Sequence, residues 1–591
     1  DLLHLVVSPT QDCSSLFFPF PSPLSLSSAS AMKEASTTPE TDDLLHLSIN
    51  RLTSLLDHHL PLVHNFKGRW SLIRTKLTAL QTHLTDLAES SSHSLSSNSL
   101  SATVLSSVAG TLADGIALAG KCADPDVLAD GKLRTQSDID SFSARLDQHI
   151  KDCEILIRSG VLQEGAVSSA AQLPREVVRA EARNLLTRLQ IGTAESKNSA
   201  MDALLGLLNE DDKNVLIAVA QGVVPVLVRL LDTTSPEMRE KTAAAIARIS
   251  SVDSSKHVLI AEGLLLLNHL IRAIESGTVF AKEKACVALQ TLSYCKENAR
   301  AIGSRGGISS LLEICHGGTP NSQAMAAGVL RNLAQFEEIK ENLIEENAIP
   351  VLIALSASGT ALARENSIGC LSNLALNDDN LKVMVAREGV VEILKSYWDS
   401  TPIGRGLEPA VELLRNLACY HPIGEVLISE GFALRLLPLL NCGVLAVRIA
   451  AAGAVYELGF CSRARREIGE CGCVSALVRM LDGKAIEEKE AAAKALSTLV
   501  LCPLNRKIFR KEEKGIVGTV QLLDPLIKNL DKKWPIAVLA ALVHSKKCRK
   551  QMVAAGACLH LPKLVESDVE GAKKLLDGLG RGKLWGVFAR P

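Results

Sequence analysis

The sequence is poor in aromatic residues and carries almost no net charge. Phe, Trp and Tyr make up 3% of the 591 residues, although apolar residues in total make up 47%. Lys and Arg number 64 and Asp and Glu number 65, which leaves a formal net charge of −1. Because contacts with phosphate groups need a basic face, this balance argues against a general nucleic-acid-binding protein. The abundance of Ala and Leu instead favours thin, evenly packed helices.

Catalytic and metal-binding motifs are also missing. The patterns G-x-S-x-G, H-E-x-x-H and G-x-x-x-x-G-K-[ST] do not occur. Gly115 to Lys121 comes nearest to a phosphate-binding loop, but Cys122 replaces the required hydroxyl residue. The 15 cysteines are mostly scattered singly on apolar faces, as reduced core thiols are, and Cys471 and Cys473 lack a second pair at zinc spacing. We therefore predict no enzyme activity, no metal site and no cofactor.

Long apolar runs and a targeting signal are absent as well. No run of 18 apolar residues occurs, so we expect no transmembrane helix. Residues 1–31 are rich in Ser and Pro and contain neither Lys nor Arg, whereas a signal or transit peptide needs early positive charge. We interpret residues 1–42 as a disordered or non-native leader, with Met32 as the expected start and a plastid-type leader as the alternative. The expected location is the cytoplasm, the nucleus or both.

What the sequence does contain is a short pattern that recurs through its last two-thirds. Each copy is anchored by a Gly, or once by an Asn, that opens an apolar run: Gly222, Gly263, Gly307, Asn347, Gly389, Gly431, Gly472, Gly515 and Gly556. Steps of 40 to 44 residues between these anchors are typical of a helical solenoid of the armadillo or HEAT length class. Within a copy, the apolar spacing predicts a short helix, a second helix after the anchor and a longer third helix. Three helices per unit favour the armadillo arrangement.

The predicted fold class is therefore all-α. We expect a right-handed α-solenoid of about nine armadillo repeats over residues 175–575, with a capping tail at 576–591. Residues 43–165 do not carry the repeat, and their apolar periodicity predicts a separate N-terminal bundle of four helices. A solenoid usually works through its extended concave surface, so a binding function is expected rather than catalysis.

Several segments resemble known families. The segments at 328–335, 369–376 and 412–419 read GVLRNLAQ, GCLSNLAL and ELLRNLAC, and they resemble the third helix of armadillo repeats. Residues 138–162 are similar to the helical region that precedes the U-box in plant U-box/armadillo proteins. Only residues 163–186 lie where a U-box would stand, and they are too short and lack its opening Cys-Pro. The chain thus resembles plant armadillo proteins that have this N-terminal region and no U-box, and ubiquitin-ligase activity is not implied.

One column of the third helices is the candidate site. It places Asn332, Asn373 and Asn416 at the same position of three consecutive repeats. The Asn amide offers both an acceptor and two donors, so it can pair with the backbone of an extended peptide. In armadillo proteins generally this column lines the concave groove and holds peptide backbone, and the resemblance implies the same role here. The alternative is structural, with the amides bridging neighbouring helices.

The positions around this column refine the prediction. Importin-α-like proteins carry Trp one turn before the Asn, whereas this chain has Gly328, Gly369 and Glu412. Recognition of nuclear-import cargo is therefore not expected, and the two Gly residues predict a smooth, open groove floor. Arg331 and Arg415 each precede an Asn and are candidates to pair with acidic side chains or phosphate of a ligand. The alternative for both is a solvated helix edge.

The C-terminal end is locally basic. Seven basic residues crowd one repeat: Lys528, Lys532, Lys533, Lys546, Lys547, Arg549 and Lys550. Together with Trp585 and Phe588 they could touch an anionic membrane surface. The alternative is a capping helix in which Leu584, Trp585 and Phe588 cover the end of the core.

The function that the sequence favours is a non-catalytic scaffold for protein–protein interaction. Its partner would be a protein that lays an extended or helical segment in the concave groove, and no nucleic acid is expected. Two alternatives are an accessory or adaptor subunit of ubiquitin-ligase machinery and a peripheral membrane-associated scaffold, although a membrane surface is the less favoured partner.

Overall fold

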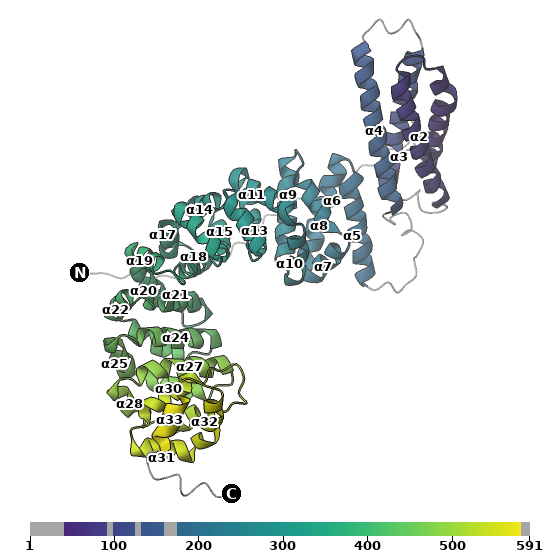
Figure 1. The fold of residues 1–591 in the computed structure, drawn as a ribbon. Helices are drawn as coiled ribbons and strands as arrows, with labels where there is room; N and C mark the ends of the chain where they lie inside the picture. Colours follow the sequence, from purple (N-terminus) through teal and green to yellow (C-terminus); the bar gives the residue numbers. More distant parts are fainter. Residues whose placement is uncertain (1–40, 91–98, 124–131, 159–173, 581–591) are drawn as a thin grey trace, which may run out of the picture. The chain divides into compact units, whose positions relative to one another are not determined.

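The computed structural model describes residues 41–90, 99–123, 132–158 and 174–580, and every regular element in these ranges is helical (Figure 1). Residues 1–40 of the predicted leader 1–42, residues 163–173 of the segment where a U-box would stand, and residues 581–591, which include Trp585 and Phe588, lie outside the described residues. Residues 41 and 42, which the prediction assigned to the leader, are helical. The chain divides into two compact units, residues 1–77 with 95–143 and residues 78–94 with 144–591.

Four helices occupy the N-terminal region. They are α1 (Thr41–Ser54), α2 (Lys67–Ser90), α3 (Ser99–Ala123) and α4 (Lys132–Arg158), with the short turns η1 (Leu55–His59) and η2 (Leu60–Leu62) after α1. Within the first unit, the Trp70 and Phe142 rings lie 6.1 Å apart. A side chain at Gly115 would collide with the Phe142 ring, so this Gly permits the close approach of α3 and α4.

Helix α3 departs from one sequence expectation. Its segment Leu100–Ala123 is long and apolar enough to cross a membrane by length and composition, with a mean hydropathy of 1.4. Half of its most apolar window is buried in the folded chain. The criterion of an uninterrupted apolar run was too strict, because single Ser, Thr and Gly residues lower hydropathy only slightly. Two bent helix pairs, α7 with α8 and α10 with α11, also pass the same test jointly.

The second unit contains the repeats. It continues with α5 (Pro174–Ile191) and α6 (Ala194–Glu210), followed in the described residues by nine helix triplets. The first helices are α7 (Asp212–Ala220), α10 (Lys256–Ala261, after η6 at Asp253–Ser255), α13 (Lys296–Ser304), α16 (Glu337–Glu345), α19 (Asp379–Arg387), α22 (His421–Ser429), α25 (Ser462–Glu470), α28 (Pro503–Phe509) and α31 (Lys546–Ala554). The second helices are α8 (Val223–Leu230), α11 (Gly263–Ser276), α14 (Gly307–Gly317), α17 (Ala348–Ser358), α20 (Val390–Ser400), α23 (Phe432–Leu440), α26 (Cys473–Leu481), α29 (Glu513–Gln521) and α32 (Ala557–Glu566). The third helices are α9 (Pro236–Ser250), α12 (Val279–Leu292), α15 (Pro320–Leu333), α18 (Ala361–Leu374), α21 (Glu408–Ala418, after η7 at Arg405–Leu407), α24 (Leu445–Leu458), α27 (Ile486–Leu499), α30 (Lys533–Leu542) and α33 (Ala572–Gly580).

The Gly anchors turn the chain between the first and second helices. Most of them adopt a positive φ, for example +88° at Gly389, and Asn347 adopts +57°. Only a residue that tolerates the left-handed region fits there without strain. Two anchors differ from the prediction: in the third repeat Gly306 rather than Gly307 has the positive φ, and Gly515 lies inside α29.

Several third helices begin at a side-chain cap. The Oγ1 atoms of Thr278, Thr319 and Thr360 accept hydrogen bonds from backbone N–H groups three residues later. These bonds satisfy N–H groups that have no partner within the helix. The caps therefore set where α12, α15 and α18 start, and with them the register of the residues that face the groove.

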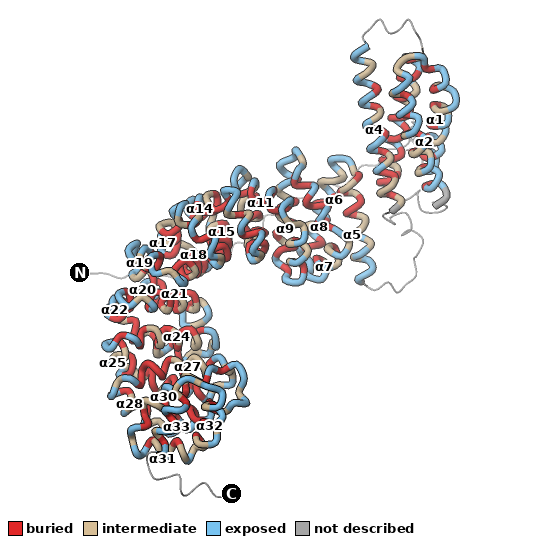
Figure 2. Tube along the Cα trace, in the orientation of Figure 1, coloured by how far each residue is buried: buried red, intermediate tan, exposed pale blue. Residues whose placement is uncertain are grey.

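Helix α6 packs on α9, and successive third helices from α9 to α33 pack directly on one another. Figure 1 shows α18, α21, α24 and α27 on the inner side of the curved array, with α19, α22, α25 and α28 on the outer side. Figure 2 shows the buried residues running continuously through the repeats between these two rows. Since each repeat packs on its neighbours, one core extends along the array and the third helices form one long inner face.

Candidate groove on the third helices

The Asn column occupies the last turn of each third helix, where it meets the end of the preceding third helix. The Asn332 Nδ2 atom donates to the carbonyl oxygen of Gln290 at 3.0 Å and to the Oγ of Ser293 at 2.9 Å. The Asn416 Nδ2 atom donates to the carbonyl oxygen and the Oγ of Ser372, at 3.0 and 3.1 Å. Asn332 is 4% exposed and Asn416 is 6% exposed. Both amides therefore bridge neighbouring repeats.

Asn373 is half-buried and makes a single bond of this kind, from Nδ2 to the carbonyl oxygen of Arg331 at 2.9 Å. Thr291, which holds the same position one repeat before Asn332, donates from Oγ1 to the carbonyl oxygen of Ser250 at 3.1 Å. The last carbonyls of a helix have no partner within it. In four consecutive repeats, the side chain at this position therefore donates to a carbonyl near the end of the preceding third helix. The sequence analysis recognised the three Asn residues but not the contribution of Thr291.

This geometry changes how the Asn residues can meet a ligand. For Asn332 and Asn416, both amide protons have acceptors inside the array. An amide that gripped both the N–H and the C=O of a peptide would have to break those bonds. In the described part of the chain, no hydrogen bond involves the Oδ1 atoms of the three residues. The acceptor end of each amide is the part that remains for a ligand.

The prediction of an open floor at Gly328 and Gly369 is wrong. A Cβ atom at Gly328 would collide with the side-chain amide of Gln290, and one at Gly369 would collide with the Arg331 guanidinium. In both cases a long side chain from the preceding third helix lies across the glycine. Gly453 of α24 is covered in the same way by the Arg415 side chain. The glycines therefore make room for polar side chains rather than leaving the groove bare.

Arg331 and Arg415 already have partners within the groove. The Arg331 Nη1 atom donates to the Oδ1 of Asn366 at 3.4 Å. Arg415 forms an ion pair with Glu412 on its own helix, with 2.9 Å between Nη2 and Oε2. Burial raises the pKa of Glu412, and the neighbouring Arg415 partly opposes this rise. An anionic ligand would compete with these contacts for each guanidinium.

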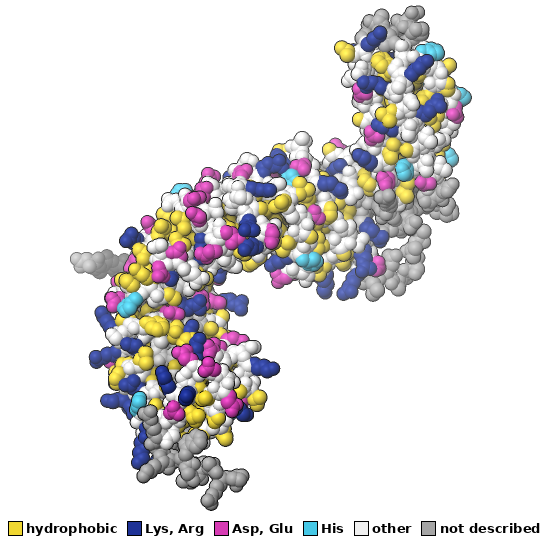
Figure 3. Space-filling model, in the orientation of Figure 1, with side chains coloured by type: hydrophobic (Ala, Val, Ile, Leu, Met, Phe, Trp, Pro, Cys, Tyr) yellow, Lys and Arg dark blue, Asp and Glu magenta, His cyan; other side chains and the backbone are white. Residues whose placement is uncertain are grey.

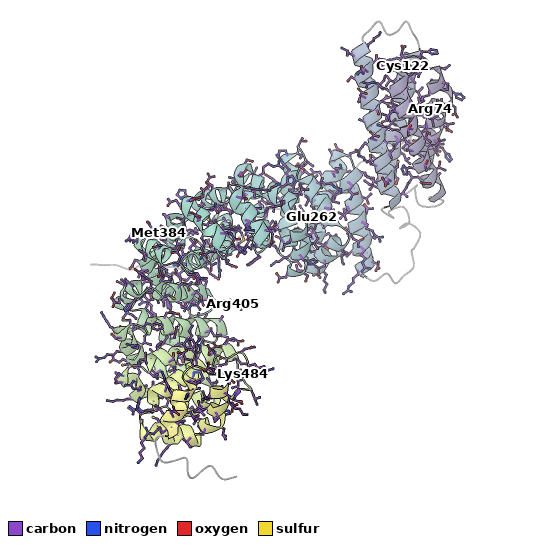
Figure 4. The ribbon with its side chains drawn as sticks, in the orientation of Figure 1. Arg74, Cys122, Glu262, Met384, Arg405 and Lys484 are labelled. Carbon is purple, nitrogen blue, oxygen red and sulfur yellow. The ribbon has the colours of Figure 1, made fainter. Side chains whose placement is uncertain are left out.

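Other third-helix side chains are freer. Glu365, Glu408, Glu457 and Glu490 are half-buried on α18, α21, α24 and α27, and none of them forms an ion pair among the described residues. Glu457 holds the Asn position on α24, and the other three each lie about two helical turns before that position on their own helices. This register directs all four toward the inner side. Figure 4 separates the two sides of the array: Arg405 and Lys484 lie on the inner side, and Met384 of α19 lies on the outer side.

An aromatic cluster marks the C-terminal part of the same face. The Tyr456 ring of α24 lies 5.4 Å from the Trp534 ring of α30 and 5.1 Å from the Phe460 ring. The Lys494 ammonium of α27 lies 4.4 Å from the Tyr456 centroid and 5.3 Å from the Trp534 centroid. Tyr456 holds the same position on α24 as Arg331 holds on α15, and Lys494 holds the same position on α27 as Gly369 holds on α18. The contact between Tyr456 and Lys494 is therefore the equivalent, in a later repeat, of the contact between Arg331 and Gly369. The repeat register could have revealed this cluster, but the sequence analysis did not single it out.

Titratable residues elsewhere bear on two further kinds of site, a metal site and a reactive thiol. No group of three or more His, Cys, Asp or Glu residues there is placed to hold a metal ion. Each described cysteine is a free thiol. Burial raises the pKa of Cys286 and of Cys370 to about 12, so these thiols stay protonated inside the core.

Comparison with known proteins agrees with this architecture. A model of the armadillo/β-catenin-like repeat matches residues 211–251, which form the first helix triplet. A model of a domain of unknown function, DUF7032, matches residues 46–161. The junction plakoglobin of Rattus norvegicus is 26% identical over 314 residues, which are 48% of this chain and 41% of the plakoglobin. The chain therefore matches less than half the length of that protein.

Two plant proteins from Arabidopsis thaliana are also similar. U-box domain-containing protein 8 is 22% identical over 255 residues, 43% of this chain and 66% of that protein. U-box domain-containing protein 44 is 23% identical over 376 residues, 61% of this chain and 45% of that protein. The resemblance to U-box proteins thus has support.

Among solved structures, an engineered protein superimposes with a TM-score of 0.58 at 23% identity, over 68% of this chain and 99% of that protein. A designed armadillo repeat protein matches 40% of this chain with a TM-score of 0.36 at 20% identity. The all-α solenoid and the armadillo repeat predicted from the sequence are confirmed.

Proposed function

We propose that this chain is a non-catalytic scaffold that binds a segment of a partner protein along the inner face of its third helices. The observation that carries the proposal is the unbroken row of third helices, each packed on the next, which presents equivalent side chains at a regular spacing. The armadillo match and the similarity to plakoglobin support an interaction scaffold. Neighbouring helices lie roughly 8–10 Å apart, so one repeat matches about three residues of an extended chain.

Within this groove, the Asn332, Asn373 and Asn416 side chains would accept hydrogen bonds from ligand N–H groups through their Oδ1 atoms. Arg331 and Arg415 would line the groove while keeping their internal partners. The free carboxylates of α18 to α27 favour a partner segment that carries Lys or Arg, because an uncompensated carboxylate attracts a cation across an interface.

Charge reversal tests the groove without removing the Asn bridges. Glu365→Lys with Glu408→Lys changes the inner face, and Glu341→Lys with Glu345→Lys makes the same change of charge on exposed sites of α16, a first helix. Each variant is fused to a proximity-labelling enzyme in the native cell, and the labelled proteins are quantified. We expect the labelling of specific partners to fall at least about tenfold in the groove variant, because like charges across an interface cost several kcal/mol. An unchanged set of partners in a variant with normal thermal stability would refute the groove.

A second candidate is an accessory role in ubiquitin transfer, favoured by the similarity to U-box domain-containing proteins over the repeats. In this case the chain would bind a ligase or its substrate and would have no ligase activity of its own. The purified chain is incubated with ubiquitin, an activating enzyme and a panel of conjugating enzymes. Ubiquitin chains formed without an added ligase would contradict a non-catalytic scaffold.

A further inference from the structure

The first helices of the last two repeats carry a concentration of free positive charge. Helices α28 and α31 contain no Asp or Glu. Six exposed cations lie on these helices or directly after α28, and we call them the basic face: Lys507, Arg510, Lys511, Lys546, Lys547 and Lys550. Within the described residues, none of the six forms an ion pair. No ion pair within the described residues therefore neutralises these cations, although Glu512 and Glu513 directly follow Lys511.

Other first helices lack this property, so it is not a general feature of the repeat. Helix α16 carries Glu337, Glu338, Glu341 and Glu345 against a single Lys. On α25, Arg463 pairs with Glu467 at 2.8 Å and Arg466 pairs with Glu470 at 2.9 Å. The charge of the first helices therefore varies along the array: α16 is acidic, two arginines of α25 are paired on their own helix, and α28 and α31 are basic.

The structure also divides the basic cluster that the sequence suggested. Lys532 is buried and donates to the carbonyl oxygens of Leu522 and Ile527, both at 3.0 Å. Lys533 pairs with Asp531 at 2.8 Å and lies on the third helix α30. Neither belongs to the basic face. Conversely, the three cations at α28 were not recognised, because 35 residues separate Lys511 from Lys546 in the sequence.

Two arginines hold these helices in place. The Arg506 Nη1 atom donates to the carbonyl oxygens of Val500 and Leu501 at 3.3 and 3.4 Å, at the end of the preceding third helix. Arg549 makes the equivalent bonds to Val543 and His544 at 2.8 and 3.2 Å. Since Arg506 and Arg549 face inward, the residues that follow them, Lys507 and Lys550, project outward at matching positions of the two repeats.

The basic face lies away from the groove. Figure 1 places α25, α28 and α31 one after another along the outer edge of the array. Figure 3 shows Lys and Arg side chains, in dark blue, along the same edge. A large partner that rests on this edge leaves the third helices accessible.

We propose that the basic face docks on the surface of an anionic lipid bilayer. Five of its six cations are Lys, whose ammonium is a hydrated point charge without the fork geometry that recognises a single phosphate or carboxylate. No aromatic side chain on α28 or α31 is exposed to stack on bases, which disfavours a single-stranded nucleic acid. A diffuse anionic surface needs neither fork nor stacking, and it attracts each nearby Lys or Arg separately.

Vesicle sedimentation with the full chain tests this assignment. The vesicles consist of phosphatidylcholine alone or of phosphatidylcholine mixed with phosphatidylserine. The variant carries Lys507→Gln, Lys547→Gln and Lys550→Gln, and the control carries Lys213→Gln, Lys296→Gln and Lys484→Gln, so both lose three positive charges at exposed sites. We expect the wild type and the control to sediment only with phosphatidylserine vesicles, and the variant to bind roughly a hundredfold more weakly. Added salt should weaken the interaction.

Three results would overturn the proposal. Binding of the wild type to neutral vesicles as strong as to anionic ones would point to insertion of an apolar helix such as α3. Equal binding of variant and control would place the contact elsewhere, provided that circular dichroism melts show both folded. Tighter binding to duplex DNA than to vesicles at the same salt concentration, lost in the variant, would assign the face to nucleic acid. Loss of vesicle binding leaves the groove experiment unaffected, because the two sets of variants share no residue.

Discussion

Replacing Asn416 by Ala should loosen the junction between the fourth and fifth repeats. The substitution removes two hydrogen bonds from Nδ2 to Ser372, at 3.0 and 3.1 Å, in a site where Asn416 is 6% exposed. Each such bond contributes about 1 kcal/mol net, and a buried carbonyl left without a donor costs about 1–3 kcal/mol more. We therefore expect the free energy of unfolding to fall by about 3–5 kcal/mol.

Asn373→Ala provides the internal comparison. It removes one bond, to the Arg331 carbonyl, at a half-buried position where water can replace the lost donor. The expected loss is about 1 kcal/mol or less. Asn416→Asp should be at least as harmful as Asn416→Ala, because a carboxylate accepts only and would face the Ser372 carbonyl.

Urea unfolding combined with hydrogen exchange measures these effects. A repeat array need not unfold in one step, so exchange of the α18 and α21 amides locates the loss where the global midpoint does not. Protection should fall at these two helices and stay unchanged at α30. If Asn416→Ala and Asn373→Ala proved equally mild, the inter-repeat bond would not be the reason for the Asn column.

Two further predictions concern packing and titration. Gly115→Ala should destabilise the N-terminal unit by about 1–3 kcal/mol, because its methyl group meets the Phe142 ring. Gly369→Ala should be nearly neutral, because the Arg331 side chain is flexible and Ala favours the helix. Thermal melts compare the two variants, and equal losses of stability would contradict the prediction. Burial raises the pKa of the Cys286 thiol from 9.0 to about 12. The unfolded chain therefore releases this proton at a lower pH than the folded chain does. The protonated thiol contributes fully to the free energy of unfolding below pH 9, and this contribution is lost as the pH rises toward 12. Urea unfolding of the wild type and of Cys286→Ala on either side of pH 9 should show a smaller alkaline loss in the variant, and identical pH slopes would argue against this reasoning.

The repeat architecture followed from the sequence because the Gly anchors recur with a period that only a solenoid explains. Positive φ at Gly389 and Asn347 is the physical cause of that pattern. The helix triplets followed too, because apolar spacing distinguishes short helices from long ones. Features that depend only on residues within one repeat, such as its turns and helices, could therefore be predicted from the sequence.

The groove was harder to predict, because its chemistry depends on neighbours about 40 residues away. The Asn332 amide was recognised as a pairing group, but its acceptors, Gln290 and Ser293, belong to the previous repeat. Gly369 was interpreted as empty space, although Arg331 fills it. Lys532 and Lys533 are adjacent in sequence, yet one is buried and the other is paired on the inner face. In each case the outcome depended on which side chain arrives from the adjacent helix.

The donors from Thr291 to Asn416 have a consequence for how this array can evolve. At Asn332, Asn373 and Asn416, the atoms that would touch a ligand and the atoms that tie one repeat to the next belong to the same amide groups. A change that frees an amide to grip a partner more firmly also weakens the stack that displays it. Cohesion and affinity are thus opposed at these positions, and sharper recognition would have to arise on side chains that carry no such link.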